Sequence, residues 1–207
     1  MKKILCFGDS NTYGFVPAGR GARFDFDVRY TGVMAEILKE RFVVLEEGFN
    51  GRTTIFNDYI KGRNGLERVA ECITPHNPID IFVIMLGTND TKTKFHATES
   101  IITNGIERVI DKALTVLPPI AKIVLVAPPH LGENVWRPFS NIDFSEQSYR
   151  TARKLGPMYR ELANRRNFLF LDASMIVESS KQDMVHLDTD AHKILGTALA
   201  DLIFKNF

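Results

Sequence analysis

The chain has 207 residues, of which 44% are hydrophobic and 25% are charged, and its formal net charge is +1. This length and composition are ordinary for a soluble globular protein, and we expect residues 1–207 to form a single domain. A nucleic-acid or membrane-surface partner requires a concentrated basic field, which this nearly balanced charge does not supply.

The apolar runs and the cysteines narrow the class of protein further. The first apolar run, residues 4–7, is too short for a signal-peptide core, and no run approaches the roughly 18 apolar residues of a membrane span. We therefore expect a cytoplasmic protein, with Cys6 and Cys72 as reduced, unpaired thiols. No group of His, Cys, Asp and Glu residues has metal-ligand spacing, so we predict no metal.

Short apolar runs alternate with helical periodicity from one end of the chain to the other. The runs predict strands at residues 4–7, 43–45, 81–86, 123–126 and 168–171. Apolar residues at helical spacing predict helices at residues 30–38, 66–73, 102–117, 149–163 and 194–203.

Continuously apolar strands that alternate with helices are typical of a parallel sheet covered on both faces. We therefore predict an α/β protein with a three-layer α/β/α, flavodoxin-like fold and a five-stranded parallel sheet in the order 2-1-3-4-5. One segment stands apart, residues 128–148, which are rich in Pro, Phe, Trp and Asn. A loop of this length is usually functional or part of an interface.

Polar motifs follow most of the predicted strands, and the carboxyl ends of parallel strands share one edge of the sheet, where ligands bind. Gly8-Asp9-Ser10 follows the first strand, Gly48 to Arg52 the second, and Gly87-Thr88-Asn89-Asp90 the third. The motif Asp183-Met184-Val185-His186 precedes the last helix. We expect all of them to meet at this edge.

These residue types suit acyl transfer. Ser10 is the candidate nucleophile, and His186 is a base that can accept its proton near neutral pH. Asp183, three residues earlier, would orient and stabilise the imidazole, the third role in a catalytic triad. The Ser10 and Gly51 backbone N–H groups and the Asn89 amide are candidate donors to an oxyanion.

Each motif also has a simpler interpretation. Residues 10–12 could cap a helix, and the segments 87–90 and 183–186 could be turns. Residues 9–12 also loosely resemble a phosphate-cradling loop, so a flavodoxin-like FMN-binding module is a non-enzymatic alternative. A catalytically inactive ester- or carbohydrate-binding protein is another. Four motifs on one edge in this order favour the enzyme, although the G-x-S-x-G signature of α/β-hydrolases is absent.

The four motifs resemble those of the SGNH, or GDSL-type, hydrolases. The blocks Gly-Asp-Ser, a glycine N–H donor, Gly-x-Asn-Asp and Asp-x-x-His are matched in order by residues 8–10, 51, 87–90 and 183–186. Further segments, among them residues 27–33 and 84–92, resemble the arylesterase/acyltransferase branch, which includes a mycobacterial arylesterase with perhydrolase activity.

The resemblance implies a cofactor-free serine esterase for short-chain acyl or aryl esters, with an acyl-serine intermediate and possible acyltransferase or perhydrolase side activity. Carbohydrate O-deacetylase and lysophospholipase or thioesterase are alternatives within the family. It also implies a homo-oligomer that assembles through residues 128–148. Candidates for the substrate pocket, or equally for core packing, are Asn11, Tyr13, Phe15, Trp136 and Phe139.

Overall fold

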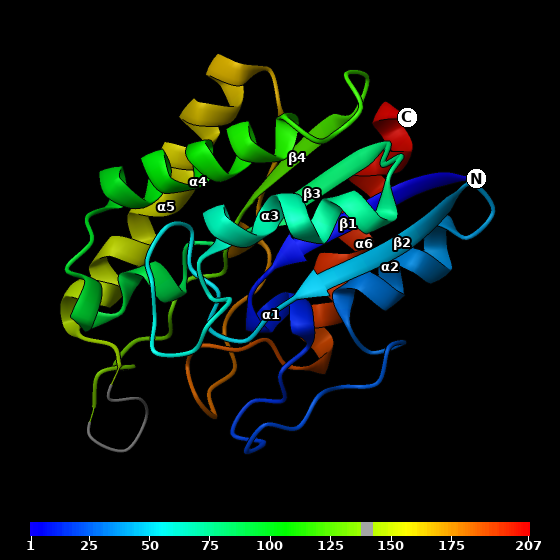
Figure 1. The fold of residues 1–207 in the computed structure, drawn as a ribbon. Coiled ribbons are helices and arrows are strands. Elements are labelled where there is room, and N and C mark those ends of the chain that lie inside the picture. Colours follow the sequence, from blue (N-terminus) through cyan, green and yellow to red (C-terminus); the bar gives the residue numbers. More distant parts are fainter. Residues whose placement is uncertain (138–142) are drawn as a thin grey trace.

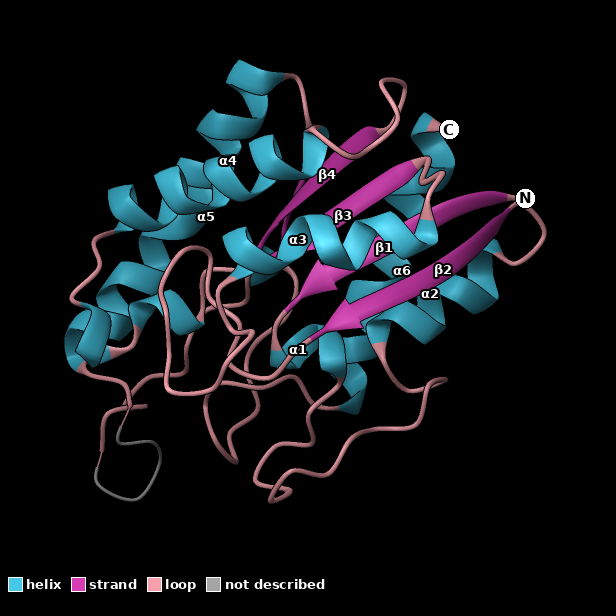
Figure 2. Cartoon of the chain, viewed as in Figure 1, coloured by secondary structure: helices cyan, strands magenta, loops and turns pink. Residues whose placement is uncertain are grey.

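The structure, a computed structural model, describes residues 1–137 and 143–207. At its centre is a five-stranded parallel sheet with the strand order β2-β1-β3-β4-β5, seen in Figures 1 and 2. The strands are β1 (Lys2–Gly8), β2 (Phe42–Gly48), β3 (Ile81–Met85), β4 (Lys122–Ala127) and β5 (Leu169–Asp172). The predicted fold class and strand order are confirmed.

Helices cover both faces of the sheet and so form the outer two layers. On one face lie α3 (Gly65–Ile73), α4 (Glu99–Leu114) and α5 (Glu146–Arg166). On the other face lie α2 (Tyr30–Leu38) and α6 (Thr189–Asn206), which pack against each other. Short helical turns fill the connections: α1 (Ser10–Tyr13), η1 (Thr74–His76), η2 (Asn89–Thr91), η3 (Thr93–Phe95) and η4 (Ala173–Met175).

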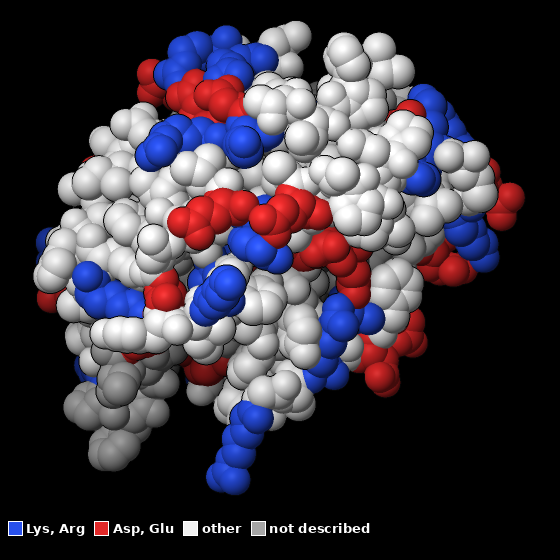
Figure 3. All heavy atoms as spheres, viewed as in Figure 1, with Lys and Arg blue, Asp and Glu red and all other residues white. Residues whose placement is uncertain are grey.

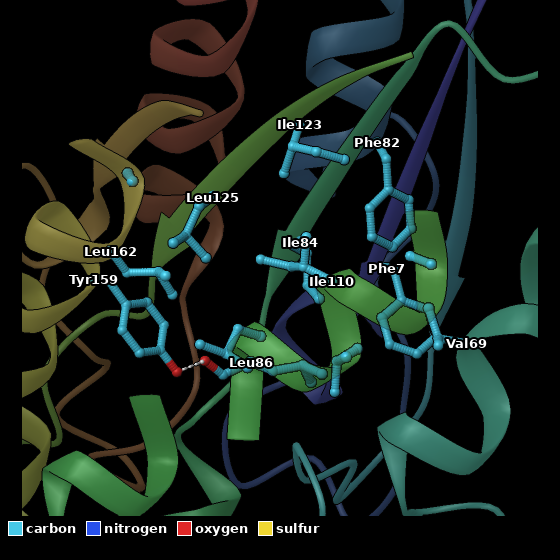
Figure 4. Packing of buried hydrophobic residues seen from close by; sticks show 14 of the residues in the cluster. Phe7, Val69, Phe82, Ile84, Leu86, Ile110, Ile123, Leu125, Tyr159 and Leu162 are labelled. Carbon is cyan, nitrogen blue, oxygen red and sulfur yellow. Dashed lines mark hydrogen bonds between the residues drawn. The ribbon is translucent and has the colours of Figure 1, made fainter. Parts of the chain in front are cut away.

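Strands β1, β3 and β4 are largely apolar on both faces because alternate residues enter two separate cores. In β1, Leu5 and Phe7 belong to the cluster under α3, α4 and α5, whereas Ile4 and Cys6 belong to the cluster under α2 and α6. Figure 4 shows the first cluster, in which the Tyr159 hydroxyl donates a 3.0 Å hydrogen bond to the Leu86 carbonyl. This bond satisfies a polar group that the apolar core would otherwise leave unpaired.

Local capping residues explain where the long helices begin. Asp188 caps α6 by accepting a hydrogen bond from the backbone N–H of Ala191. Ser145 caps α5 in a reciprocal arrangement with Ser148, which starts this helix earlier than the apolar periodicity predicts. Asn167 then ends α5 in the left-handed conformation.

The segment of residues 128–148 packs partly against the body of the protein. Leu131, Val135 and Phe144 form a third apolar cluster with Ala152 of α5 and with Val185, next to the candidate histidine. Residues 138–142, which include the pocket candidate Phe139, lie outside the described residues. Assembly through this segment stays a prediction.

The connections after the strands gather at one edge of the sheet, at the bottom of Figure 1, and both termini lie at the opposite edge. Acidic and basic side chains are interspersed on the face that Figure 3 shows.

Cys6 and Cys72 are free cysteines, and of the two only Cys6 is fully buried. Within residues 1–137 and 143–207, no helix is long and apolar enough to cross a bilayer.

His192 links the two helices on one face of the sheet. Its ring is fully buried, and Nδ1 accepts a 3.2 Å hydrogen bond from the backbone N–H of Tyr30, the first residue of α2. The N-cap position of α2, Arg29, has no side-chain capping bond, so the imidazole of α6 takes that role. Burial lowers the pKa of His192 to about 4.

This buried histidine predicts acid sensitivity. The unfolded chain binds a proton at His192 below about pH 6.5, whereas the folded chain does so only near about pH 4. The free energy of unfolding should therefore fall by up to about 3 kcal/mol from this group as pH drops through that window. In urea titrations at several pH values, His192→Asn should lose much of this fall. The same change at the exposed His96 should not, and equal pH dependence in all three proteins would contradict the assignment.

Candidate active site

Ser10 lies at the sharp turn between β1 and α1. Asp9 is the N-cap of this short helix, and its carboxylate accepts a 2.9 Å hydrogen bond from the backbone N–H of Asn11. Capping is thus done by the residue before Ser10, which leaves the Ser10 hydroxyl available. Its Oγ is 2.9 Å from Nε2 of His186.

Asp183 and His186 form the second half of this hydrogen-bonded chain. The Nδ1 of His186 is 2.7 Å from Oδ2 of Asp183, and because a carboxylate only accepts, Nδ1 carries the proton and Nε2 faces Ser10 as an acceptor. The other carboxylate oxygen accepts the backbone N–H groups of Val185 and His186. Burial alone would raise the pKa of Asp183, but the His186 side-chain and backbone hydrogen bonds lower it to about 2.

Three candidate oxyanion donors belong to residues that line the same cavity as the Ser10 hydroxyl. The backbone N–H groups of Ser10 and Gly51 have no hydrogen-bond partner among the described residues. The Asn89 amide donates to the Arg52 carbonyl at 3.2 Å and, over a longer 3.4 Å, to the Asp9 carboxylate. Gly51 has a φ of +79°, a backbone conformation that favours glycine, and a side chain there would also have to displace the flexible end of Arg63.

Buried polar side chains support the catalytic groups and the oxyanion donors from the interior of the protein. Arg52 is almost fully buried, donates to the Gly8 carbonyl at the end of β1, and lies 4.1 Å from the centre of the Phe7 ring. Burial raises the pKa of Asp9 to about 6, although its hydrogen bond from Asn11 and nearby positive charges oppose the shift. Burial likewise raises the pKa of Asp90 to about 7, against hydrogen bonds from Thr54.

A small cavity of about 150 Å³ opens over these groups. Its lining consists of Ser10, Phe15, Asn50, Gly51, Arg63, Asn89, Lys92, Phe144, Val185 and His186. The two cations at its wall are ion-paired, Arg63 with Asp58 at 2.7 Å and Lys92 with Asp143 at 3.0 Å. The cavity therefore combines an apolar rim with the hydrogen-bonding groups of Ser10, Asn89 and His186.

The structure brings Ser10, Gly51, Asn89, Asp183 and His186 together, as the sequence motifs predict. Among the pocket candidates that the structure describes, only Phe15 lines this cavity, and its ring centroid is 4.4 Å from that of His186.

Asn11, Tyr13 and Trp136 do not line this cavity, so the prediction that they form the pocket needs correction, whereas Phe139 lies outside the described residues. Trp136 packs on Tyr149, and Tyr13 lies under the Arg23 guanidinium. Asn11 is buried, accepts a 2.9 Å hydrogen bond from the Leu187 backbone and donates weakly to the Val185 carbonyl. Asn11 therefore joins residues 185–187, which flank His186, to α1, the helix that begins at Ser10.

Sequence reasoning missed several residues of the cavity wall. Lys92 directly follows the Gly87–Asp90 motif and Phe144 belongs to the aromatic loop, so position alone could have suggested both. Arg63 had no such signal, because a turn of the chain between β2 and α3 brings it back over Gly51. In the described part of the chain, no group of three or more His, Cys, Asp or Glu side chains could hold a metal ion.

Comparisons with known proteins show which family and which solved structures this chain is similar to. The sequence profile of the GDSL-like lipase/acylhydrolase family matches residues 6–194. The M. smegmatis aryl esterase is 35% identical, with a TM-score of 0.93 and 100% of each chain covered. A carbohydrate acetylesterase from Sinorhizobium meliloti is 32% identical, with a TM-score of 0.90 and 100% of each chain covered. A search of curated protein sequences finds no match.

The contribution of the Asn11 hydrogen bonds can be measured as a change in the free energy of unfolding. Asn11→Ala leaves a buried N–H and a buried carbonyl of residues 185–187 without their partner, so the free energy of unfolding should fall by roughly 1–3 kcal/mol. Asn206→Ala, which removes a side-chain bond at the exposed end of α6, is the matched control and should change little. Equal stability of the two variants in chemical denaturation would refute this contribution.

Proposed function

The chain belongs to the GDSL-like lipase/acylhydrolase family, and from this premise we propose that it is a serine esterase acting on short-chain acyl or aryl esters. One observation carries the proposal. The hydrogen-bonded chain from the Ser10 hydroxyl through the His186 imidazole to the Asp183 carboxylate has donor–acceptor distances of 2.9 and 2.7 Å. This geometry activates a serine hydroxyl for attack on a carbonyl carbon.

In the first half of the reaction, Ser10 Oγ attacks the ester carbonyl carbon while Nε2 of His186 takes the hydroxyl proton. The imidazolium that forms is stabilised by the Asp183 carboxylate, whose low pKa keeps it ionised at neutral pH. The same proton then passes from Nε2 to the departing alcohol oxygen. The carbonyl carbon remains bonded to Ser10 as an acyl-serine ester.

The developing oxyanion is held by the backbone N–H groups of Ser10 and Gly51 and by the Asn89 amide. The two backbone groups are free to donate, and the 3.4 Å contact from Asn89 to Asp9 is long enough for an oxyanion to replace it. Such donors contribute roughly 3 kcal/mol each to transition-state stabilisation. In the second half, a water molecule that is deprotonated by His186 attacks the acyl carbon, and the bond from this carbon to Ser10 Oγ then breaks. His186 returns the proton to Oγ, and the acid leaves.

The cavity supports a short acyl group. At about 150 Å³ it is well below the roughly 300–1,000 Å³ of sites that enclose drug-sized ligands. Phe15, Phe144 and Val185 form the apolar part of its wall. The small volume favours short-chain esters over the long acyl chains of lysophospholipids or fatty acyl thioesters.

Removal of acetyl groups from carbohydrates is a second candidate function. It is favoured by the carbohydrate acetylesterase from Sinorhizobium meliloti, which aligns over the full chain at 32% identity. The two candidates share the acyl group and differ in the alcohol that leaves. Comparing kcat/KM for acetylated sugars with that for aryl acetates separates them.

The mechanism predicts that Ser10→Ala and His186→Ala each lower kcat for p-nitrophenyl acetate by roughly 10⁴-fold, because either change removes the proton transfer that accompanies attack. Steady-state hydrolysis of the purified variants measures this. Ser100→Ala and His96→Ala alter exposed residues that do not line the cavity and serve as matched controls.

Near-wild-type turnover by either folded active-site variant would rule out the mechanism. A serine-reactive fluorophosphonate gives a second measurement, with labelling expected at Ser10 in the wild type and lost in Ser10→Ala. An unlabelled wild-type protein would instead point to an inactive ligand-binding relative.

The cavity also predicts acyl-chain selectivity. For p-nitrophenyl esters, kcat/KM for octanoate should be roughly tenfold or more below that for acetate, since the longer chain must displace the cavity wall or remain in water. Phe144→Leu widens the wall and should narrow the difference. Faster hydrolysis of octanoate than of acetate would contradict the short-acyl assignment while leaving the triad mechanism intact.

A further inference from the structure

We propose that the loop of residues 14–24 is a positioning element for the Asp183–His186 pair and that Arg23 fastens this loop to the sheet. The proposal rests on the esterase function, because it adds positioning residues to the same active site. None of these residues is needed for the chemistry itself. The loop acts by limiting the motion of the carboxylate and the imidazole.

The first contact is a backbone hydrogen bond to the carboxylate. The N–H of Ala18 donates to Oδ2 of Asp183 at 3.2 Å, and the same oxygen is 2.7 Å from Nδ1 of His186. The other donors to Asp183 belong to its own turn, namely Val185 and His186. Within the described residues, Ala18 is thus the one donor that ties this carboxylate to a distant part of the chain.

The second contact is with the imidazole. The Phe15 ring lies against the His186 ring with centroids 4.4 Å apart and an interplanar angle of 31°. A ring packed this closely against one face restricts rotation of the imidazole out of line with Ser10 Oγ. One short loop therefore contacts both members of the acid–base pair.

The loop is organised by its own backbone bonds. An antiparallel bridge joins Phe15 to Arg23, and the N–H groups of Val16 and Phe24 donate across the loop to Ala22 and Gly14 at 3.0 and 2.8 Å. At its tip, Ala18 and Arg20 have φ values of +53° and +50°, a conformation that residues with side chains rarely adopt. Such local strain persists only where surrounding contacts hold the backbone.

Arg23 supplies the fastening. Its Nε donates to the Tyr13 carbonyl at 2.7 Å, its guanidinium lies 4.4 Å from the centre of the Tyr13 ring, and it forms an ion pair with Glu46 of β2. Glu46 also accepts hydrogen bonds from Arg29 and from the Thr31 hydroxyl, so it is itself firmly held. The Arg23 side chain is 37% exposed, and its loss should therefore loosen the loop without unfolding the protein.

Replacing Arg23 should therefore lower kcat and leave substrate binding, measured as KM, nearly unchanged. Arg23 does not line the cavity, so its replacement leaves the cavity wall and the oxyanion donors in place. A more mobile loop frees Asp183 and His186 to leave the geometry that proton transfer requires. Misplacement of catalytic groups by about 1 Å costs up to roughly 100-fold in rate, so a partial loosening should cost about tenfold.

The test compares Arg23→Met with Arg20→Met in the full-length protein, using p-nitrophenyl acetate. We expect Arg23→Met to lower kcat about tenfold with KM changed less than about twofold. Arg20 is an exposed arginine of the same loop without an ion pair among the described residues, and its variant should match the wild type. Wild-type kcat in a folded Arg23→Met protein overturns the proposal.

A double-mutant cycle separates positioning of this pair from a general structural effect. In a His186→Ala background the loop has no imidazole to position, so Arg23→Met should cause no further loss of the residual turnover. A further tenfold loss there overturns the proposal. The proposed function fails separately, through an active Ser10→Ala or His186→Ala variant.

Ala18 provides a second pair of variants if Arg23→Met does not fold. Ala18→Gly keeps the N–H and favours the left-handed conformation, so kcat should stay within about twofold of the wild type. Ala18→Pro removes the N–H and cannot adopt a positive φ, so kcat should fall about tenfold or more. Equal kcat values for these two variants overturn the proposal.

Discussion

The position of one imidazole governs the rest of this active site. His186 must accept a proton from Ser10 on one side and keep its other proton on Asp183, and the two groups it joins come from opposite ends of the chain. A parallel sheet makes this possible because every strand delivers its following loop to the same edge. The fold thus solves the problem of bringing distant residues within hydrogen-bonding distance of one another.

The positions of the catalytic groups at this edge depend on polar side chains that are buried and hydrogen-bonded. Asn11 joins the nucleophile helix to the histidine segment, and Arg52 holds the end of β1. Burying such groups is favourable only when they are hydrogen-bonded, so each also dictates the path of the backbone that it contacts. The loop of residues 14–24 also positions a catalytic group through a hydrogen bond. Its donor is the backbone N–H of Ala18, so the side chain at this position needs no particular chemistry.

The function follows from a combination that no single part of the site provides. Ser10 alone would be an ordinary serine near a helix start, and Asn89 alone would be a residue of a short helical turn. Together with free backbone donors and a small apolar-walled cavity, they support acyl transfer from short esters. The pKa values show the same division of roles, with Asp183 kept ionised by its hydrogen bonds and Asp9 shifted upward by burial.

By itself, the sequence determined the layer architecture, the strand order and the motifs that meet at the carboxyl edge. Apolar periodicity and the order of strands and helices are local properties, and the carboxyl edge follows from them. Only the tertiary structure decided that Asn11 joins α1 to residues 185–187, that Trp136 packs away from the cavity, and that Ala18 reaches Asp183. These outcomes depend on side-chain directions and on contacts between segments far apart in the chain, which a linear pattern does not encode.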